Sequence, residues 1–284
     1  MLLRSYLFKR ITIVGVGLMG GSLGLAIKKH GLAREVIGLS HRQGALDQAV
    51  QMGAIDTPCL DVKTAICNAD LVILATPVDS IIKLFTTIDP YLKRSCIVTD
   101  VGSTKASIME HAEKTLANPT FFVGSHPLAG SEKKGVANAS ADLFEGARCL
   151  ITPTEKTNPF AREKIKLFWA KLNMQVKILG AEEHDRALAY VSHLPHLLAY
   201  GLISGIPPEF LEYGSQGLKD TTRVAASSPQ VWSDICMANP KNILNALDQC
   251  IEYLGHFRKA IVSRDHKALL NYFIKAQEKR NLLN

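Results

Sequence analysis

Polar residues with catalytic potential occur in four motifs: Asp100–Lys105 (DVGSTK), Gly124–Glu132 (GSHPLAGSE), Ser192–His196 (SHLPH) and Lys219–Arg223 (KDTTR). The first two motifs follow apolar runs typical of buried strands, and His126 stands just after the second run. A histidine at the carboxyl end of a strand is suited to general-base chemistry, because imidazole titrates near neutral pH. The position of His126 alone leaves a catalytic role and a structural role in a turn equally open.

Two further histidines, His193 and His196, are spaced one helical turn apart. Such a pair can bind a metal ion. Pro195 lies between them, however, and no cysteine or carboxylate pattern accompanies them, so no metal site is expected. For His193 we keep a substrate contact and a structural role bonded to the backbone as alternatives.

A glycine-rich turn, Gly15–Gly20 (GVGLMG), follows the apolar run Ile11–Gly15 and precedes a helix expected over Ser22–His30. Strand, turn and helix in this order are the context of a dinucleotide-binding turn. The glycines allow the tight bend, the approach of a pyrophosphate and close packing of the helix on the strand. The expected cofactor-binding residues are Gly15, Gly17, Leu18, Met19 and Gly20. The alternative is a glycine turn without a ligand.

The cofactor type is indicated by the end of the second expected strand, Val36–Leu39. An acidic residue about 20 positions after the glycine turn binds the ribose of NAD. This chain has Ser40, His41 and Arg42 instead, which suit a ribose phosphate. We therefore favour NADP, with NAD possible if Arg42 simply faces solvent.

Thr76 and Pro77 follow another strand-like run, Leu71–Ala75. A proline there ends the strand at the carboxyl edge of the sheet, where a dinucleotide lies. We expect Thr76 and Pro77 to contact the cofactor, although they could serve only to shape the loop.

The elements that position these residues fall into two series. Up to about residue 180, short uniformly apolar runs alternate with helical segments, as in parallel strands covered on both faces. Beyond it, helical spacing dominates, with long helices expected over Ala181–Ile203 and Ile243–Ile261. The predicted fold is a Rossmann-type α/β protein: a doubly wound, mainly parallel sheet (1–180) followed by an all-α domain (181–284).

Composition excludes several protein classes. The six cysteines form no C-x-x-C pair, which argues against a zinc cage and favours a reducing compartment. The net charge of +7 is spread along the chain and suits anionic small molecules better than nucleic acid. No apolar run approaches the roughly 18–20 residues of a membrane span, and no secretory signal is evident. We expect a cytoplasmic protein with no nucleic-acid or membrane partner.

Taken together, the glycine turn and the ordered polar motifs resemble the prephenate and arogenate dehydrogenases of tyrosine biosynthesis. The resemblance covers nearly the whole chain and includes Leu150–Thr154, Ser228, Pro229 and Trp232. It implies a nicotinamide-dependent dehydrogenase whose helical half also forms a homodimer.

The resemblance also implies roles for individual residues. His126 corresponds to the catalytic histidine that takes the proton from the ring hydroxyl of the substrate, and Ser103 to the serine that orients that histidine and the nicotinamide. Arg223 corresponds to the arginine that grips a substrate carboxylate, and His196 lines the substrate pocket. Acidic partners that position Arg223 or gate the pocket, and a neighbouring serine, complete the expected substrate site: Glu132, Asp220 and Ser131.

The implied reaction is an oxidative decarboxylation of prephenate to 4-hydroxyphenylpyruvate. A hydrogen-bond donor such as His196 would favour the keto group of prephenate over the ammonium group of arogenate. The alternatives are arogenate dehydrogenase, which yields tyrosine, and a cyclohexadienyl dehydrogenase of broad specificity. NADP use within part of the family points toward arogenate. Tyrosine is a possible inhibitor and would act at the active site itself.

Two other readings fit a Rossmann half joined to a helical half. A β-hydroxyacid or 6-phosphogluconate type of dehydrogenase would place a catalytic lysine in the first helix after the boundary, but Ala181–Ile203 contains no lysine. A non-catalytic NADP sensor would not need Ser103, His126 and Arg223 together.

Overall fold

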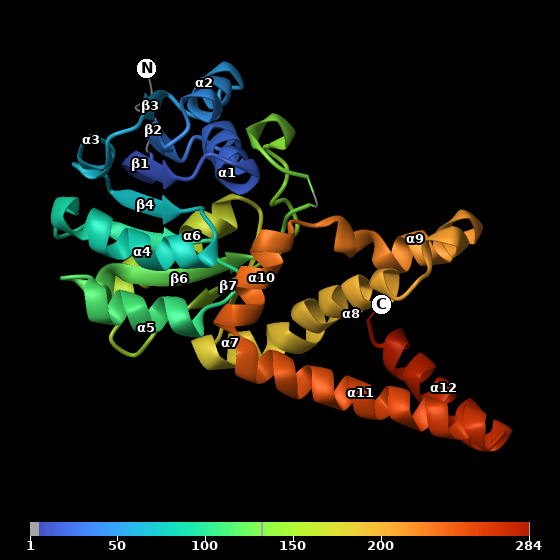
Figure 1. The fold of residues 1–284 in the computed structure, drawn as a ribbon. Helices are drawn as coiled ribbons and strands as arrows, with labels where there is room; N and C mark the ends of the chain where they lie inside the picture. Colours follow the sequence, from blue (N-terminus) through green and yellow to red (C-terminus); the bar gives the residue numbers. More distant parts are fainter. Residues whose placement is uncertain (1–5, 132, 284) are drawn as a thin grey trace.

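The computed structural model describes residues 6–131 and 133–283. Figure 1 shows a sheet with helices on both faces, joined to a helical part that extends away from it as two arms. Within the described residues, no helix is both long enough and apolar enough to cross a bilayer.

Among the described residues, the sheet has eight strands in the order β3-β2-β1-β4-β5-β6-β7-β8. Neighbouring strands run parallel except for β7, which is antiparallel to β6. This confirms the predicted doubly wound, mainly parallel sheet. The strands are β1 (Phe8–Val14), β2 (Ala33–Leu39), β3 (Thr57–Cys59), β4 (Leu71–Leu74), β5 (Ile97–Asp100), β6 (Phe122–Pro127), β7 (Arg148–Thr152) and β8 (Gln175–Ile178).

Helices cover both faces of this sheet, and each face has its own hydrophobic core. Side chains of β1 alternate between the two cores: Ile11 and Ile13 enter one, and Val14 enters the other. Burial on both faces explains why the central strands, such as β4 (LVIL), are uniformly apolar. One face carries α1 (Leu18–Lys29), α2 (Gln43–Gln51) and α6 (Pro159–Lys171), and the other carries α3 (Val62–Ile66), α4 (Val78–Ile88) and α5 (Ala106–Thr115).

The edge strand β3 is absent from the prediction. It has only three residues, includes Pro58 and is mostly exposed, so it carries no apolar signal. After β8 ends at Ile178, the chain enters helix α7 at Ala181 and remains helical. The division expected at residue 180 falls in this connection.

The expected single helix over Ala181–Ile203 is interrupted. It consists of α7 (Ala181–Leu188), a π-helical turn (Ala189–His193) and α8 (Leu194–Ser204). Pro195 has no N–H to donate to the preceding turn, which is a physical reason for the break. The π-helical turn includes Ser192 and His193 of the SHLPH motif.

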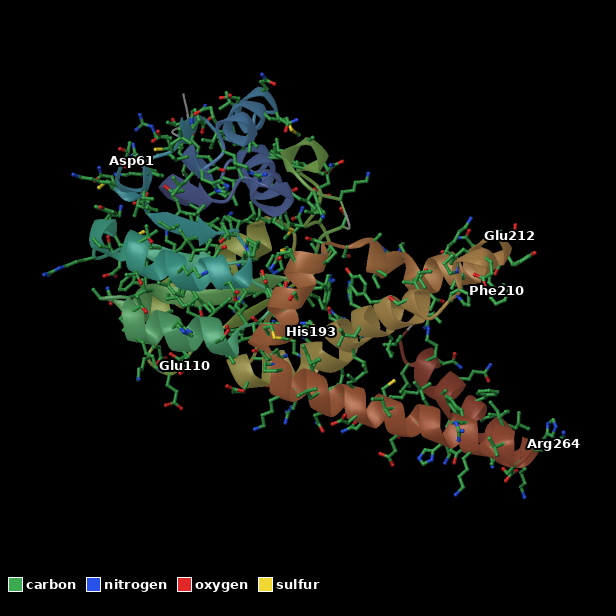
Figure 2. All side chains as sticks on the ribbon, viewed as in Figure 1. Asp61, Glu110, His193, Phe210, Glu212 and Arg264 are labelled. Atoms are coloured by element: carbon green, nitrogen blue, oxygen red, sulfur yellow. The ribbon has the colours of Figure 1, made fainter. Side chains whose placement is uncertain are left out.

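The two arms seen in Figure 1 are formed by helices of the helical half. One arm contains α8 and α9 (Gln216–Thr222), and the other contains α11 (Pro240–Val262) and α12 (His266–Asn281). Helix α10 (Pro229–Ala238) lies between the arms and contacts α4 of the sheet half. Figure 2 shows Phe210 at the end of one arm and Arg264 at the end of the other. Helix α12 has no buried residue among those described, and Leu254, Val262 and Phe273 are each more than half exposed. Apolar faces of this extent are typical of an interaction surface.

Candidate active site

A cavity of about 830 Å³ lies between the carboxyl edge of the sheet and the helical half. Its walls come from the glycine turn, the loops after β4 and β5, the end of β6, and helices α8 and α10. In doubly wound folds this edge of the sheet is where ligands bind.

The glycine turn forms one wall. Gly15 has φ +97°, and a Cβ there would lie 2.7 Å from the Ala75 oxygen, while a Cβ on Gly20 would lie 1.9 Å from the Gly15 oxygen. Both positions therefore require glycine. Gly17 has open space where a Cβ would be, and Gly17, Leu18 and Met19 line the cavity. Gly15 and Gly20 do not line the cavity but allow the close backbone contacts that form the turn.

Helix α1 starts at this turn without a side-chain cap or an acidic residue in its first turn. Its first amide groups are thus available to an anion, which the helix dipole also favours. Thr76 and Pro77 line the same cavity from the loop after β4. These features fit a dinucleotide, which would supply a hydride acceptor beside the substrate.

Ser40, His41 and Arg42 lie outside the cavity wall, at the carboxyl end of β2. The Gly15 N–H donates to the Leu39 carbonyl at 2.9 Å, so the end of β2 adjoins the glycine turn. His41 and Arg42 are exposed, and the Arg42 N–H donates to the Ser40 hydroxyl at 3.2 Å.

His126 lies near the end of β6 and lines the cavity. Its Nδ1 is 2.9 Å from Nε2 of His184, and Nδ1 of His184 is 2.8 Å from Oδ1 of Asp185. Burial, followed by the charges of His184 and Lys105, holds the pKa of His126 well below its ordinary value of 6.5. His126 is therefore neutral near pH 7, as a general base must be.

His184 and Asp185 were not among the candidate residues from the sequence. Both are buried at the start of the helical half, in α7. The adjacent pair gives no motif, because only the fold brings His184 to His126. The signal available in the sequence was a His-Asp pair within the first turns of a helix, where no partner could be assigned.

Asp100 and Lys105 form a fully buried ion pair beneath the loop after β5. Asp100 also accepts hydrogen bonds from the backbone N–H groups of Gly102 at 2.8 Å and Ser125 at 3.0 Å. Because the charges are paired and the Asp100 carboxylate also accepts these backbone hydrogen bonds, the buried pair holds the loop in one conformation. This loop carries Ser103, which lines the cavity.

The helical half contributes His196, Arg223 and Trp232 to the cavity. His196 stacks on Trp232 with ring centroids 3.6 Å apart, and its Nδ1–H donates to the Ser192 carbonyl at 2.9 Å. Burial, and then the charge of Arg223, lowers the pKa of His196. Neutral His196 thus carries its proton on Nδ1, and its lone pair is on Nε2, on the side of the ring away from Ser192. Trp232 is part of the cavity wall.

The other expected substrate-binding residues differ in whether they line the cavity. Ser131 lines the cavity and accepts from the Lys133 N–H at 3.2 Å. Asp220 is exposed, lies outside the cavity wall, and accepts from Gln216 Nε2 at 2.7 Å. Glu132 lies outside the described residues.

His193 is buried where the two halves meet, as Figure 2 shows, and does not line the cavity. Its Nδ1 faces the Asn239 amide nitrogen at 3.4 Å. Burial lowers its pKa to about 4. This geometry corresponds to the structural alternative for His193: the ring faces the Asn239 side chain and also the backbone of Ser103. For metal binding, no cluster of three or more ligating side chains exists within the described part of the chain.

Thus His126 and Arg223, from different halves, border one cavity with a dinucleotide-type turn. This combination defines a nicotinamide-dependent oxidoreductase with a Rossmann domain. The nucleotide-binding domain of prephenate dehydrogenase matches residues 23–178, and the dimerization domain of prephenate dehydrogenase matches residues 180–275. The chain belongs to the prephenate dehydrogenase family.

Individual relatives agree with this membership. The chain is 34% identical to prephenate dehydrogenase of Bacillus subtilis, covering 95% of this chain and 75% of the relative. It is 35% identical to cyclohexadienyl dehydrogenase of Zymomonas mobilis, covering 96% and 95%. The crystal structure of prephenate dehydrogenase from Aquifex aeolicus with hydroxyphenyl propionate and NAD+ superposes with a TM-score of 0.91 at 31% identity, covering 100% of both chains.

Proposed function

We propose that the chain catalyses the NAD(P)-dependent oxidative decarboxylation of prephenate to 4-hydroxyphenylpyruvate. The observation that carries this proposal is that His126, which is held neutral, and Arg223 border the same cavity as the glycine turn. The substrate has two carboxylates and a ring hydroxyl, which correspond to these cationic and basic groups.

In the proposed reaction, His126 takes the proton of the ring hydroxyl while a hydride leaves the same ring carbon for the bound nicotinamide. The ring carboxylate then departs as carbon dioxide and its electron pair enters the ring, which becomes aromatic. The proton held by His126 returns to the resulting phenolate oxygen. Arg223 grips a carboxylate through two parallel hydrogen bonds, and Ser103 and Ser131 contribute polar groups to the same cavity.

Arogenate is a second candidate substrate, and His196 is the observation that favours it. As a hydrogen-bond donor, His196 would favour the keto group of prephenate. In the structure, the N–H of neutral His196 donates to the Ser192 carbonyl. Its other ring nitrogen can therefore accept a hydrogen bond from an ammonium group. Prephenate is therefore supported by the named relatives, not by His196.

Steady-state assays with both substrates and both cofactors test the function. We expect reduced cofactor and carbon dioxide to form in equal amounts from prephenate, with 4-hydroxyphenylpyruvate as product. Turnover of arogenate alone would replace the proposal with its second candidate. The absence of turnover with either substrate would refute it.

Two further points are part of the proposal. We propose NADP over NAD because Ser40, His41 and Arg42 replace an acidic residue after β2. We also propose that a second copy of the chain covers the exposed apolar faces of α11 and α12, as the matched dimerization domain suggests. Tyrosine, if it inhibits, should compete with the substrate, since it resembles the aromatic product.

A further inference from the structure

A continuous row of hydrogen bonds leads away from the cavity behind His126. It runs from His126 Nδ1 to His184 Nε2 at 2.9 Å, and from His184 Nδ1 to Asp185 Oδ1 at 2.8 Å. His184 and Asp185 are at most 1% exposed, so water does not compete for these contacts. The row joins β6 of the sheet half to α7 of the helical half.

The far end of the row is fixed as an acceptor. Asp185 Oδ1 accepts from the Lys105 N–H at 2.7 Å, and Oδ2 accepts from the Ala106 N–H at 2.9 Å. Both amides belong to the start of α5, where the helix dipole also favours a negative charge. Hydrogen bonds of this kind stabilise the ionised carboxylate. Asp185 therefore accepts from His184, and the proton of neutral His184 is on Nδ1.

This proton order determines the state of His126. With its proton on Nδ1, neutral His184 has a lone pair on Nε2 and needs a donor there. The facing atom is Nδ1 of His126, which must carry the proton of that ring. The lone pair of His126 is then on Nε2, the ring nitrogen left for the cavity that His126 lines.

We propose that His184 is a positioning residue which, held by Asp185, fixes His126 in the Nδ1–H tautomer and so presents its basic Nε2 to the substrate hydroxyl. The role of Nε2 toward the substrate hydroxyl rests on the proposed function, whereas the tautomer of His126 does not. When His126 accepts a proton, its charge is compensated through His184 by the carboxylate of Asp185. The nearby charge of Lys105 is paired with Asp100 and does not replace this contribution.

A purely structural role is the competing explanation, in which His184 only ties α7 to Asp185 and the start of α5. Two amide substitutions separate the two roles. In His184→Gln the longer side chain places an amide near the position of Nε2, where its oxygen can accept from His126. In His184→Asn the shorter side chain places an amide near Nδ1, where it can donate to Asp185 but does not reach His126.

The direct test is nuclear magnetic resonance of ¹⁵N-histidine-labelled protein, with the His126 signals assigned from a His126→Gln variant. Two-bond ¹H–¹⁵N correlations distinguish the tautomers of neutral imidazole. We expect Nδ1–H for His126 in the wild type and in His184→Gln, and a tautomer mixture in His184→Asn. An Nε2–H tautomer in the wild type, or an unchanged Nδ1–H tautomer in His184→Asn, would overturn the inference.

Kinetics provides the second measurement. We expect kcat to fall about 10²-fold in His184→Asn and at most about tenfold in His184→Gln, with cofactor binding by fluorescence unchanged in both. A larger loss of kcat in His184→Gln than in His184→Asn would support the structural role instead. If wild-type protein shows the expected tautomer but turns over neither substrate, the proposed function fails and the tautomer assignment stands.

Discussion

The sheet half and the helical half differ in how far each covers its own apolar surface. Around the sheet, each face is closed by helices, and residues such as Ile11, Ile73 and Trp169 are fully buried. In the helical half, the described core that is not shared with the sheet has three buried residues, Ala189, Ile243 and Ala246. The sheet half thus covers most of its apolar surface within the chain, whereas the arms leave apolar faces exposed, as is typical of interaction surfaces.

The same division is seen in the chemistry. The sheet half provides the glycine turn and His126, and the helical half provides Arg223 and His196. On the proposed function, the rigid half carries the groups that react and the arms carry the groups that hold the substrate. His184 is the exception, since it belongs to the helical half but contacts the reacting imidazole.

The largest effect is expected from His126→Asn, which removes the base from the sheet half. Since a positioned base typically contributes 10²–10⁴-fold, we expect kcat to fall about 10³-fold while cofactor affinity is retained. Stopped assays for kcat and fluorescence titration with cofactor check this. A variant that retains most of its turnover would show that the reacting group lies elsewhere.

The sheet half was largely predictable from the sequence because its signals are local. Apolar runs mark central strands such as β1, β2 and β4, and the glycine turn follows from the spacing of Gly15, Gly17 and Gly20. Strand β3 forms instead by pairing with β2, and its three residues, which include Pro58, carry no pattern. In the helical half the helical spacing was visible, but the π-helical turn at Ala189–His193 depends on how the helices pack around it.

The site shows the same limit. Motifs placed Ser103, His126, His196 and Arg223 at one cavity, whereas His184 was missed because its partner is 58 positions away in the chain. Lys105 is a second example. It closes the DVGSTK motif, and the structure shows that it is the buried partner of Asp100. Sequence spacing cannot report that pairing.

The junction between the two halves should weaken in acid because of His193. Its pKa falls from 6.5 to about 4 on folding, so the unfolded chain binds more protons in this range. Stability is therefore full above pH 6.5 and is lost as the pH falls toward 4, by up to about 3 kcal/mol.

Urea unfolding at pH 7.5 and pH 4.5, at constant protein concentration, measures this loss. We expect His193→Gln to lose less stability between the two pH values than the wild type does. Substitution of the exposed His111 by Gln serves as the matched control and should not alter the difference. Equal losses in the wild type and His193→Gln would assign the acid sensitivity to other groups.

The uncovered arms can be tested with Leu254→Glu in α11. Leu254 is 52% exposed in the single chain, and a charge buried in a dimer interface without a partner is strongly unfavourable. We expect the dimer to weaken by about 10²-fold, measured as molar mass by light scattering over a dilution series. Leu60, 54% exposed beside β3, provides the control, and Leu60→Glu should leave the mass unchanged.

The division of labour between the halves predicts a different kinetic pattern for Arg223→Lys than for His126→Asn. Lysine keeps the charge but loses the paired hydrogen bonds to a carboxylate. We expect KM for the substrate to rise about 30-fold with little change in kcat and none in KM for the cofactor. A fall in kcat of the same size would mean that Arg223 acts in the transition state, which would remove the distinction between the two halves.

The smallest expected effect concerns Arg42, at the cofactor edge of β2. If Arg42 contacts a ribose phosphate, Arg42→Ala should lower kcat/KM for NADP about tenfold and leave the value for NAD nearly unchanged, since a charge-assisted hydrogen bond at an exposed site is worth little more than this. Arg34 is also exposed but lies near the opposite end of β2, so Arg34→Ala is the matched control and should change neither value. A parallel decrease for both cofactors in Arg42→Ala would show that Arg42 does not read the phosphate. The preference would then have to be set inside the cavity, by the turn that begins at Gly15.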